Sequence, residues 1–237
     1  MSASVTHAIL DSGTGLYSFP DAARYIGAKP SELRRWLNGY EHTARDGRKT
    51  FMPPLWESEI QSPDIEGLGF RDLLELRFVH TFRECGVPVA LIRATLEAAR
   101  EDFDSAYPLT NETFRTDGRR IFAQEVEASG DINLTDPVKR QRVIEKVIGP
   151  SLRTGIEFDF HGRASRWFPM RNSKAIVFDP KRKFGQPILS DYDIPTVAIA
   201  SAVKAESGDQ ALVARLFQVS RAAVRHAVAF ETRSGGT

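Results

Sequence analysis

The stretch from Tyr17 to Tyr40, YSFPDAARYIGAKPSELRRWLNGY, constrains the fold of this chain most strongly. Ser18 and Asp21 have the spacing of a helix-capping box, and Gly27 suits the left-handed position that ends a short helix. A second helix is expected after Pro30, where apolar residues recur at i, i+3 and i+4: Leu33, Trp36 and Leu37. Two short helices joined by a tight turn at this spacing predict a helix-turn-helix.

The second of these helices carries basic residues on its outer side. Arg34 and Arg35 point away from the apolar positions, and Ser31 precedes them by one helical turn. Such a helix can enter a DNA major groove, so we expect Ser31, Arg34 and Arg35 to face the groove. From these residues alone, an ordinary helical hairpin with solvated arginines is an equal alternative.

A basic hairpin is expected directly after this motif. Asp46-Gly47 is a two-residue hairpin signal between residues 42–45 and 48–52. A hairpin in this position is the arrangement of a winged helix, and the alternative is a surface hairpin with solvated charges. We expect phosphate contacts from the basic residues at its tip and before the second helix: Lys29, Arg45, Arg48 and Lys49.

Two longer helices follow, over residues 69–84 and 89–102, with a break at Gly86-Val87-Pro88. The order of helix-turn-helix, basic wing, long helix, glycine turn and further helix resembles the MerR-like winged-helix DNA-binding domain. The likeness is carried by DAARYIGAKPSELRRWLNGY and FRECGVPVALIRATL and covers residues 15–103. No long coiled-coil helix follows, unlike in MerR proteins.

Residues 104–162 are expected to form a connector. Asp117-Gly118 predicts a second hairpin over residues 114–123, with Phe114, Ile121 and Phe122 in the core. The acidic run over residues 125–136 is expected to be a loop. A helix then opens at Asp136-Pro137 and buries four apolar residues: Val143, Ile144, Val147 and Ile148.

The C-terminal part changes character. A short strand is expected over residues 175–178, followed by helices over residues 196–204, 209–217 and 220–231. The last two helices repeat the helix-turn-helix spacing at Ala214, Val219-Ser220 and Val224, with Gln218 at the turn position. The spacing alone leaves open whether this copy contacts DNA or protein.

The sequence over residues 174–232 resembles the small helical domain of VapB-type antitoxins. The matching features are a strand followed by Asp179-Pro180, the bend Gly185-Gln186-Pro187, the helix start Ile194-Pro195-Thr196, and the final helix from Val219 to Val224. A MerR-like domain joined to this domain looks like a longer, two-domain antitoxin of this type. The resemblance implies that the chain blocks a PIN-like ribonuclease toxin and represses their shared operon. A homodimer or higher oligomer is expected because operators are usually palindromic.

Basic and aromatic residues alternate over residues 162–183 and just beyond. One interpretation is nucleic-acid binding. A second is an arm that enters the acidic, metal-binding pocket of the toxin and pairs with its carboxylates. A third places the aromatic residues in the core and the lysines in water. The toxin interpretation assigns six contact residues: Arg166, Trp167, Arg171, Lys181, Arg182 and Phe184.

Composition is that of a globular protein, with 41% hydrophobic and 27% charged residues and a net charge of +1. No long apolar run predicts a membrane span, and residues 1–15 do not resemble a secretory signal. The single cysteine, Cys85, excludes an internal disulfide and fits a reducing, cytoplasmic location.

We find no catalytic constellation of known type and expect neither enzymatic activity nor a cofactor. One alternative is a metal-dependent nuclease, in which Glu157, Asp159 and His161 share one face of a strand. Another is a MerR-like regulator that senses a small effector in a pocket over residues 104–160 and has no toxin partner.

The sequence thus predicts a mainly α-helical protein with short β-hairpins. Its expected parts are a tail over residues 1–14, the winged helix-turn-helix over 15–103 and the connector over 104–162. The antitoxin-type domain, three helices with a short strand pair, covers 163–232, and a tail covers 233–237.

Overall fold

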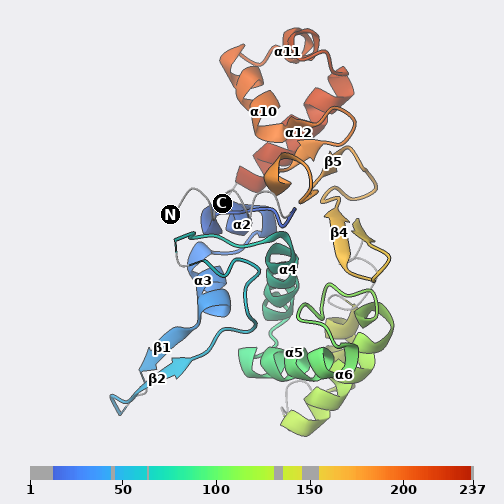
Figure 1. Ribbon diagram of the computed structural model, residues 1–237. Coiled ribbons are helices and arrows are strands. Elements are labelled where there is room, and N and C mark those ends of the chain that lie inside the picture. Colours follow the sequence, from blue (N-terminus) through green and yellow to red (C-terminus); the bar gives the residue numbers. More distant parts are fainter. Residues whose placement is uncertain (1–12, 44–45, 63, 131–135, 146–154, 236–237) are drawn as a thin grey trace.

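The computed structural model describes residues 13–43, 46–62, 64–130, 136–145 and 155–235. Over these residues the protein is mainly helical, with short antiparallel strand pairs. In Figure 1 the N-terminal helices lie near the middle, a hairpin protrudes below them, and the last three helices form a lobe at the top.

Helices α2 (Phe19–Ile26) and α3 (Pro30–Asn38) form the predicted helix-turn-helix. The Ser18 hydroxyl accepts a hydrogen bond from the backbone N–H of Asp21 and so caps α2. Gly27 ends α2 in the left-handed conformation, at φ +84°. The expected apolar residues Leu33, Trp36 and Leu37 of α3 are all buried.

Strands β1 (Tyr40–Thr43) and β2 (Lys49–Met52) pair antiparallel and form the expected hairpin, called the wing below. The prediction of a two-residue turn at Asp46-Gly47 is wrong. The last described strand pair is Thr43 with Lys49, so more than two residues lie between the paired strands. Arg45 lies outside the described residues. Figure 1 shows the wing extending away from the helices beyond α3.

Helices α4 (Phe70–Glu84) and α5 (Val89–Phe103) lie where the sequence predicts them. α4 is buried on most of its circumference, because the helix-turn-helix, α5 and the C-terminal strands all pack around it. It forms the centre of the molecule.

The predicted hairpin over residues 114–123 is wrong. These residues begin the helix α6 (Phe114–Ser129), which packs along α5 and continues through the first part of the loop predicted over residues 125–136. Residues 131–135 lie outside the described residues. The Asp117-Gly118 signal fails because Phe114, Gly118, Ile121 and Phe122 recur at helical spacing and are buried together on one face of α6. Phe114, Ile121 and Phe122 are nevertheless buried, as expected.

Helix α8 (Pro137–Val143) follows, and the side chain of Asp136 caps it through the N–H of Val138. Val143 and Ile144 are buried, as predicted. Val147 and Ile148 lie outside the described residues.

Two small sheets connect this region to the last helices. Strands β3 (Ile156–Phe158) and β4 (Ala164–Trp167) form a hairpin. Strands β5 (Ile176–Val177), β6 (Ile188–Leu189) and β7 (Ile194–Pro195) form a three-stranded antiparallel sheet. The short 3₁₀-helix η2, Lys183–Gly185, makes the predicted bend before β6.

Three helices complete the C-terminal lobe: α10 (Thr196–Ala205), α11 (Gln210–Leu216) and α12 (Arg221–Gly235). Their positions agree with the sequence prediction. Gln218, in the turn between α11 and α12, adopts the left-handed conformation at φ +55°.

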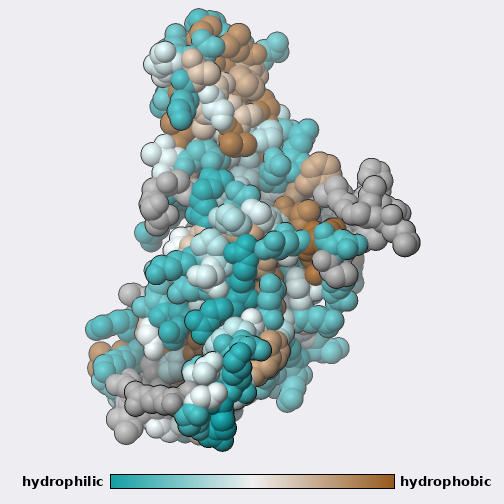
Figure 2. All heavy atoms as spheres, turned by 90° about the vertical axis from the view of Figure 1, so that its left-hand side faces the viewer, coloured by the Kyte–Doolittle hydropathy of each residue, from teal (hydrophilic) through white to brown (hydrophobic). Residues whose placement is uncertain are grey.

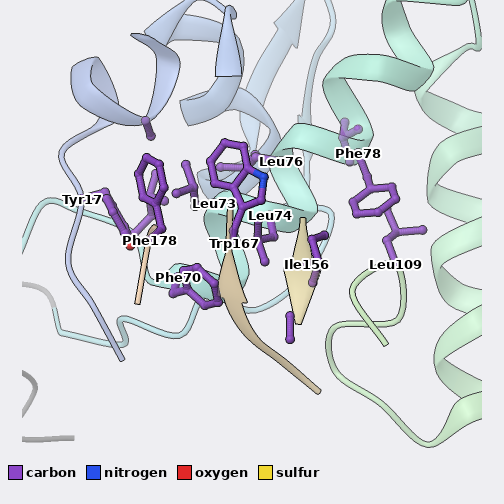
Figure 3. Packing of buried hydrophobic residues seen from close by; sticks show 14 of the residues in the cluster. Tyr17, Phe70, Leu73, Leu74, Leu76, Phe78, Leu109, Ile156, Trp167 and Phe178 are labelled. Atoms are coloured by element: carbon purple, nitrogen blue, oxygen red, sulfur yellow. The ribbon is translucent and has the colours of Figure 1, made fainter. Parts of the chain in front are cut away.

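The N-terminal and C-terminal units share one hydrophobic core. Figure 3 shows Tyr17 and Phe178 beside one another, with Trp167 between Phe178 and α4. Trp167 stacks on Phe178 at 4.7 Å between ring centroids, and Tyr25 of α2 meets Phe230 of α12 at 6.2 Å. The helix-turn-helix is therefore fixed against the C-terminal lobe.

Candidate nucleic-acid interface

The outer face of α3 is the centre of the candidate interface. The buried side of this helix is apolar, while Ser31, Arg35 and Asn38 are exposed and Arg34 is partly exposed. Residues at i, i+3, i+4 and i+7 lie on one side of a helix, so these four side chains form a single polar strip. The second helix of a helix-turn-helix uses such a strip to contact base edges in the major groove.

Asn38 was not among the predicted contacts. It ends α3 one turn beyond Arg34 and Arg35 and is exposed. Its i+7 spacing from Ser31 is the signal that identifies it. An amide at this position can pair with the edge of an adenine.

The two arginines of the strip are held in place by aromatic rings. The Arg35 guanidinium lies 3.9 Å from the centroid of the Tyr40 ring, and that of Arg34 lies 4.9 Å from the Phe19 ring. Cation–π contacts of this kind orient a guanidinium while leaving N–H groups at its edge for other partners.

Arg34 also has an internal anionic partner. Its Nη2 lies 2.8 Å from Oε1 of Glu66, and its Nε donates to the same oxygen at 3.1 Å. The Glu66 side chain is 72% exposed, so water screens this pair and the pair contributes about 1 kcal/mol at most. A phosphate or a guanine edge can therefore replace Glu66 at low cost.

The residues predicted to contact phosphates lie at the surface around this strip. Lys29 is exposed at the start of α3. On the wing, Arg48 pairs with Asp46 at 2.7 Å and Lys49 pairs with Glu41 at 3.4 Å. Both pairs are exposed, and such pairs exchange readily for phosphate oxygens. The structure thus brings α3 and the wing together on one side of the molecule (Figure 1).

A buried carboxylate fixes the segment that follows the wing. Asp72 of α4 accepts hydrogen bonds from Trp56 Nε1, from the Ser58 hydroxyl and from the backbone N–H groups of Glu59 and Gly69, at 2.8–3.0 Å. Burial raises the pKa of Asp72, and these four donors act in the opposite direction. The network anchors the segment that follows the wing to α4, at the centre of the molecule.

The structure places the six predicted toxin-contact residues in three different environments: one is buried, two are paired within the chain and three are exposed. Trp167 is only 3% exposed and belongs to the core, so its side chain offers no surface to a partner. This burial corrects the surface role predicted for Trp167. Its cause is the pairing of β4 with residue 178, which carries Trp167 onto Phe178.

Two of the predicted arginines are paired within the chain. Arg166 Nε lies 3.0 Å from Oδ2 of the buried Asp179, and Arg182 Nε lies 2.9 Å from Oδ1 of Asp193. Arg171, Lys181 and Phe184 are exposed. These three side chains are therefore accessible at the surface.

The C-terminal lobe also exposes apolar side chains. Val197 of α10 and Leu216 at the end of α11 are 52% and 60% exposed. Figure 2 shows hydrophobic residues gathered on this lobe, at the top of the view.

The predicted nuclease geometry is wrong. Strand β3 ends at Phe158, and Asp159 lies in the following turn, where Oδ1 accepts from the N–H groups of His161 and Arg163. Glu157, Asp159 and His161 therefore do not line one face of a strand. Within the described ranges, no three His, Cys, Asp or Glu side chains converge as metal ligands.

Comparison with known families supports the helix-turn-helix. Residues 15–96 match the family model described as "Putative DNA-binding HTH domain". This match covers α2, α3, the wing, α4 and half of α5. The chain therefore contains a DNA-binding domain of the helix-turn-helix type.

Two proteins of Mycobacterium tuberculosis are similar over most of their length. One, named "Putative antitoxin VapB45", is 24% identical over 207 residues, which are 83% of this chain and 86% of the relative. The other, "Uncharacterized protein Rv2308", is 24% identical over 196 residues, which are 79% of this chain and 78% of the relative.

The crystal structure of Rv2018 from Mycobacterium tuberculosis shares the fold. It superposes with a TM-score of 0.67 at 21% identity and covers 90% of this chain and 96% of that protein. The likeness extends beyond the helix-turn-helix to nearly the whole architecture. In the part of the chain that the structure describes, no helix has the length and apolar character needed to cross a membrane.

Proposed function

We propose that this chain is an antitoxin that represses its own operon through α3 and the wing, and that it neutralises a PIN-like ribonuclease toxin. The observation that carries the DNA-binding half is the strip Ser31, Arg34, Arg35 and Asn38 on the second helix of a helix-turn-helix. The wing beside it is of the MerR-like type and holds the phosphate backbone through Arg45, Arg48 and Lys49, with Lys29 at the helix start.

The toxin-binding half rests on the VapB-type resemblance of residues 174–232 and on the relative named an antitoxin. Arg171, Lys181 and Phe184 supply exposed cationic and aromatic groups near the C-terminal lobe. A PIN-like nuclease holds its metal with several carboxylates, and arginine pairs with carboxylates in a bidentate manner. Arg166 and Arg182 join this surface when the toxin's carboxylates replace their internal partners.

The chain acts without catalysis of its own, in the cytoplasm, and as a homodimer or higher oligomer. A two-fold assembly places two copies of α3 in successive major grooves of a palindromic operator. No cofactor takes part.

DNA binding is tested on the promoter upstream of the gene with the double variant Arg34→Ala/Arg35→Ala. Each arginine that pairs with a base edge contributes about 1–3 kcal/mol, so we expect a loss of affinity of at least tenfold. The control Arg119→Ala removes an exposed positive charge from α6, outside the interface. Equal affinity of the double variant and the wild type refutes the role of α3.

Toxin neutralisation is tested by expressing the adjacent reading frame alone and together with this chain. The neighbour should arrest growth alone, and co-expression should restore growth. The triple variant Arg171→Ala/Lys181→Ala/Phe184→Ala should fail to restore growth while still binding the promoter. If the neighbour is harmless alone, the antitoxin half is refuted and a transcriptional regulator without a toxin remains.

A further inference from the structure

The chain contains two helix-turn-helix units whose residues correspond at a constant spacing. The first unit is α2–α3, and the second is α11–α12 in the C-terminal lobe. α3 begins at Pro30 and α12 begins at Arg221, which lies 191 positions further along the chain. The same offset relates the caps, the turns and the buried contacts of the two units described below.

The two units are built with the same hydrogen bonds. Ser18 caps α2 through the N–H three residues on, at 3.2 Å, and Asp209 caps α11 in the same way, at 2.9 Å. The turn is closed by Ala28 N–H to Ala23 O in one unit and by Val219 N–H to Ala214 O in the other, both at 3.0 Å.

The turn and the buried contact also match. Gly27 and Gln218 occupy equivalent positions and are both left-handed, with φ of +84° and +55°. Leu33 of α3 and Val224 of α12 are equivalent and fully buried. The left-handed conformation is unfavourable for a non-glycine residue, and here the geometry of the turn imposes it on Gln218. α12 is therefore the second helix of its helix-turn-helix unit, equivalent to α3 in the first unit.

The outer face of α12 is basic. Arg225 is equivalent to Arg34, and His226 is equivalent to Arg35. Arg221 and Arg225 are exposed, one turn apart on the same side of the helix, and neither forms an ion pair with another described residue. Residues 219–230 contain no acid, and the small side chains of Ala222 and Ala229 flank the arginines. In the major groove, alanine side chains can contact the methyl group of thymine beside arginines that contact the DNA.

The two units are rigidly connected. α12 packs directly on α2 through the Tyr25 and Phe230 rings, and Arg24 Nη1 lies 2.7 Å from Oε2 of Glu231. We propose that α11–α12 is a second DNA-binding site, which contacts the duplex through Arg221 and Arg225 while α3 contacts another segment. One chain then recognises a bipartite site whose two parts have a fixed spacing.

This site goes beyond the function proposed above, which places DNA contacts only on α3 and the wing. The rival occupant is a protein that binds the exposed apolar residues Val197 and Leu216 of the same lobe. The positive charges of Arg221 and Arg225, which have no ion-pair partner among the described residues, favour DNA, because a phosphate backbone supplies a continuous row of negative charges. The experiment below separates the two.

Binding sites are selected from a random double-stranded DNA library by the full-length chain and by three variants. These are Arg221→Ala/Arg225→Ala, Arg34→Ala/Arg35→Ala and the control Arg119→Ala. For each protomer, we expect the wild type and the control to select two elements at a fixed spacing, one contacted by α3 and one by α12, in addition to any two-fold repeat produced by dimerisation. Each double variant should lose one part, with a fall in affinity of at least tenfold.

Salt dependence gives a second readout. If Arg221 and Arg225 each neutralise a phosphate, their removal should lower the slope of log affinity against log salt by about two. Ala229→Glu adds a carboxylate to the same face without removing packing and should reproduce the loss. Circular dichroism melting checks that each variant is folded.

The proposal is overturned if Arg221→Ala/Arg225→Ala and Ala229→Glu select the wild-type site with unchanged affinity and salt slope. In that case, altered self-association of these variants in sedimentation experiments would assign α12 to a protein partner. Loss of binding only in Arg34→Ala/Arg35→Ala would leave the function of α3 intact and remove the second site. If the wild-type chain enriches no sequence from the library, DNA binding by α3 and DNA binding by α12 are both overturned.

Discussion

The Tyr17 hydroxyl donates a 2.7 Å hydrogen bond to the backbone carbonyl of Gly185, although 168 residues separate the two. Tyr17 precedes the first helix of the helix-turn-helix, and Gly185 forms the bend before β6. The bond is buried, and an added Cβ at Gly185 would lie 2.4 Å from the Tyr17 oxygen. The close approach therefore requires a glycine, and it joins the two units of the chain at one point.

Tyr17→Phe keeps the ring in the core and removes only this bond. A buried carbonyl without its donor costs about 1–3 kcal/mol, so we expect the free energy of unfolding to fall by that amount in urea denaturation. Promoter affinity of the folded protein should not change, because Tyr17 lies outside the α3 strip. A variant as stable as the wild type would show that water replaces the hydroxyl.

Alanine variants of Gly39 and Gly27 form a matched pair that tests how the wing is held where β1 follows α3. Both have positive φ, +75° and +84°, but an added Cβ at Gly39 would lie 2.6 Å from the Met52 carbonyl oxygen, while Gly27 has no neighbour within 4 Å. Gly27→Ala should cost about 1–2 kcal/mol. Gly39→Ala should cost more, because β2 must move away from α3.

The same pair predicts a difference in binding. Gly39→Ala should weaken promoter binding beyond its effect on stability, since the wing moves relative to α3, whereas Gly27→Ala should not. Thermal melting and gel shifts measure the two effects. If the two variants lose equal stability and equal promoter affinity, the close contact at Gly39 does not fix the position of the wing.

Glu66→Gln should strengthen DNA binding. The substitution removes the anionic partner of Arg34 and a negative charge near the groove-facing strip. Because an exposed pair contributes up to about 1 kcal/mol, the gain in affinity should be about two- to fivefold. Glu97→Gln, an exposed acid on α5, makes the same change of charge outside the strip and serves as the control. A gain of equal size in both would assign the effect to net charge.

Glu75 makes the stability of the fold depend on pH. This side chain of α4 is buried, and its Oε1 accepts hydrogen bonds from the N–H and hydroxyl of Thr110. Burial raises the pKa of Glu75 from 4.5 to about 8. Between these values the folded protein keeps a proton that the unfolded chain releases, so its free energy of unfolding falls as the pH rises.

The expected slope is about 1.4 kcal/mol per pH unit between about pH 4.5 and pH 8, and this contribution is constant above and below the window. Glu75→Gln carries no titratable group and should lose this slope, so that it gains stability relative to the wild type as the pH rises. Urea denaturation from pH 5 to pH 9 measures it. Glu101→Gln, an exposed acid on α5, should keep the wild-type slope.

Local rules explain what the sequence predicted well. The cap at Ser18, the left-handed Gly27 and the apolar residues of α3 are set by neighbours within a few positions, and all three are confirmed. The positions of α10, α11 and α12 follow from the same kind of signal.

The errors of the sequence-based prediction arise where contacts with other parts of the fold determine the conformation or the burial of a residue. Gly118 lies in a helix because the apolar face of α6 packs on α5, and Trp167 is buried because Phe178 and α4 cover it. The internal partner of Arg34 could not be foreseen, since Glu66 approaches from a loop 32 positions away. The packing of α2 on α12 could not be foreseen either, because no pattern within either helix specifies which other element it will contact.

The Arg24–Glu231 ion pair and the Tyr25–Phe230 contact have a consequence for turnover of the protein in the cell. Because these contacts join α2 to α12, we expect the helix-turn-helix and α12 to unfold together. A protease that unfolds the chain from α12 should therefore disrupt α2 and α3 in the same event. Under the proposed function, release of the toxin and loss of repression would then coincide.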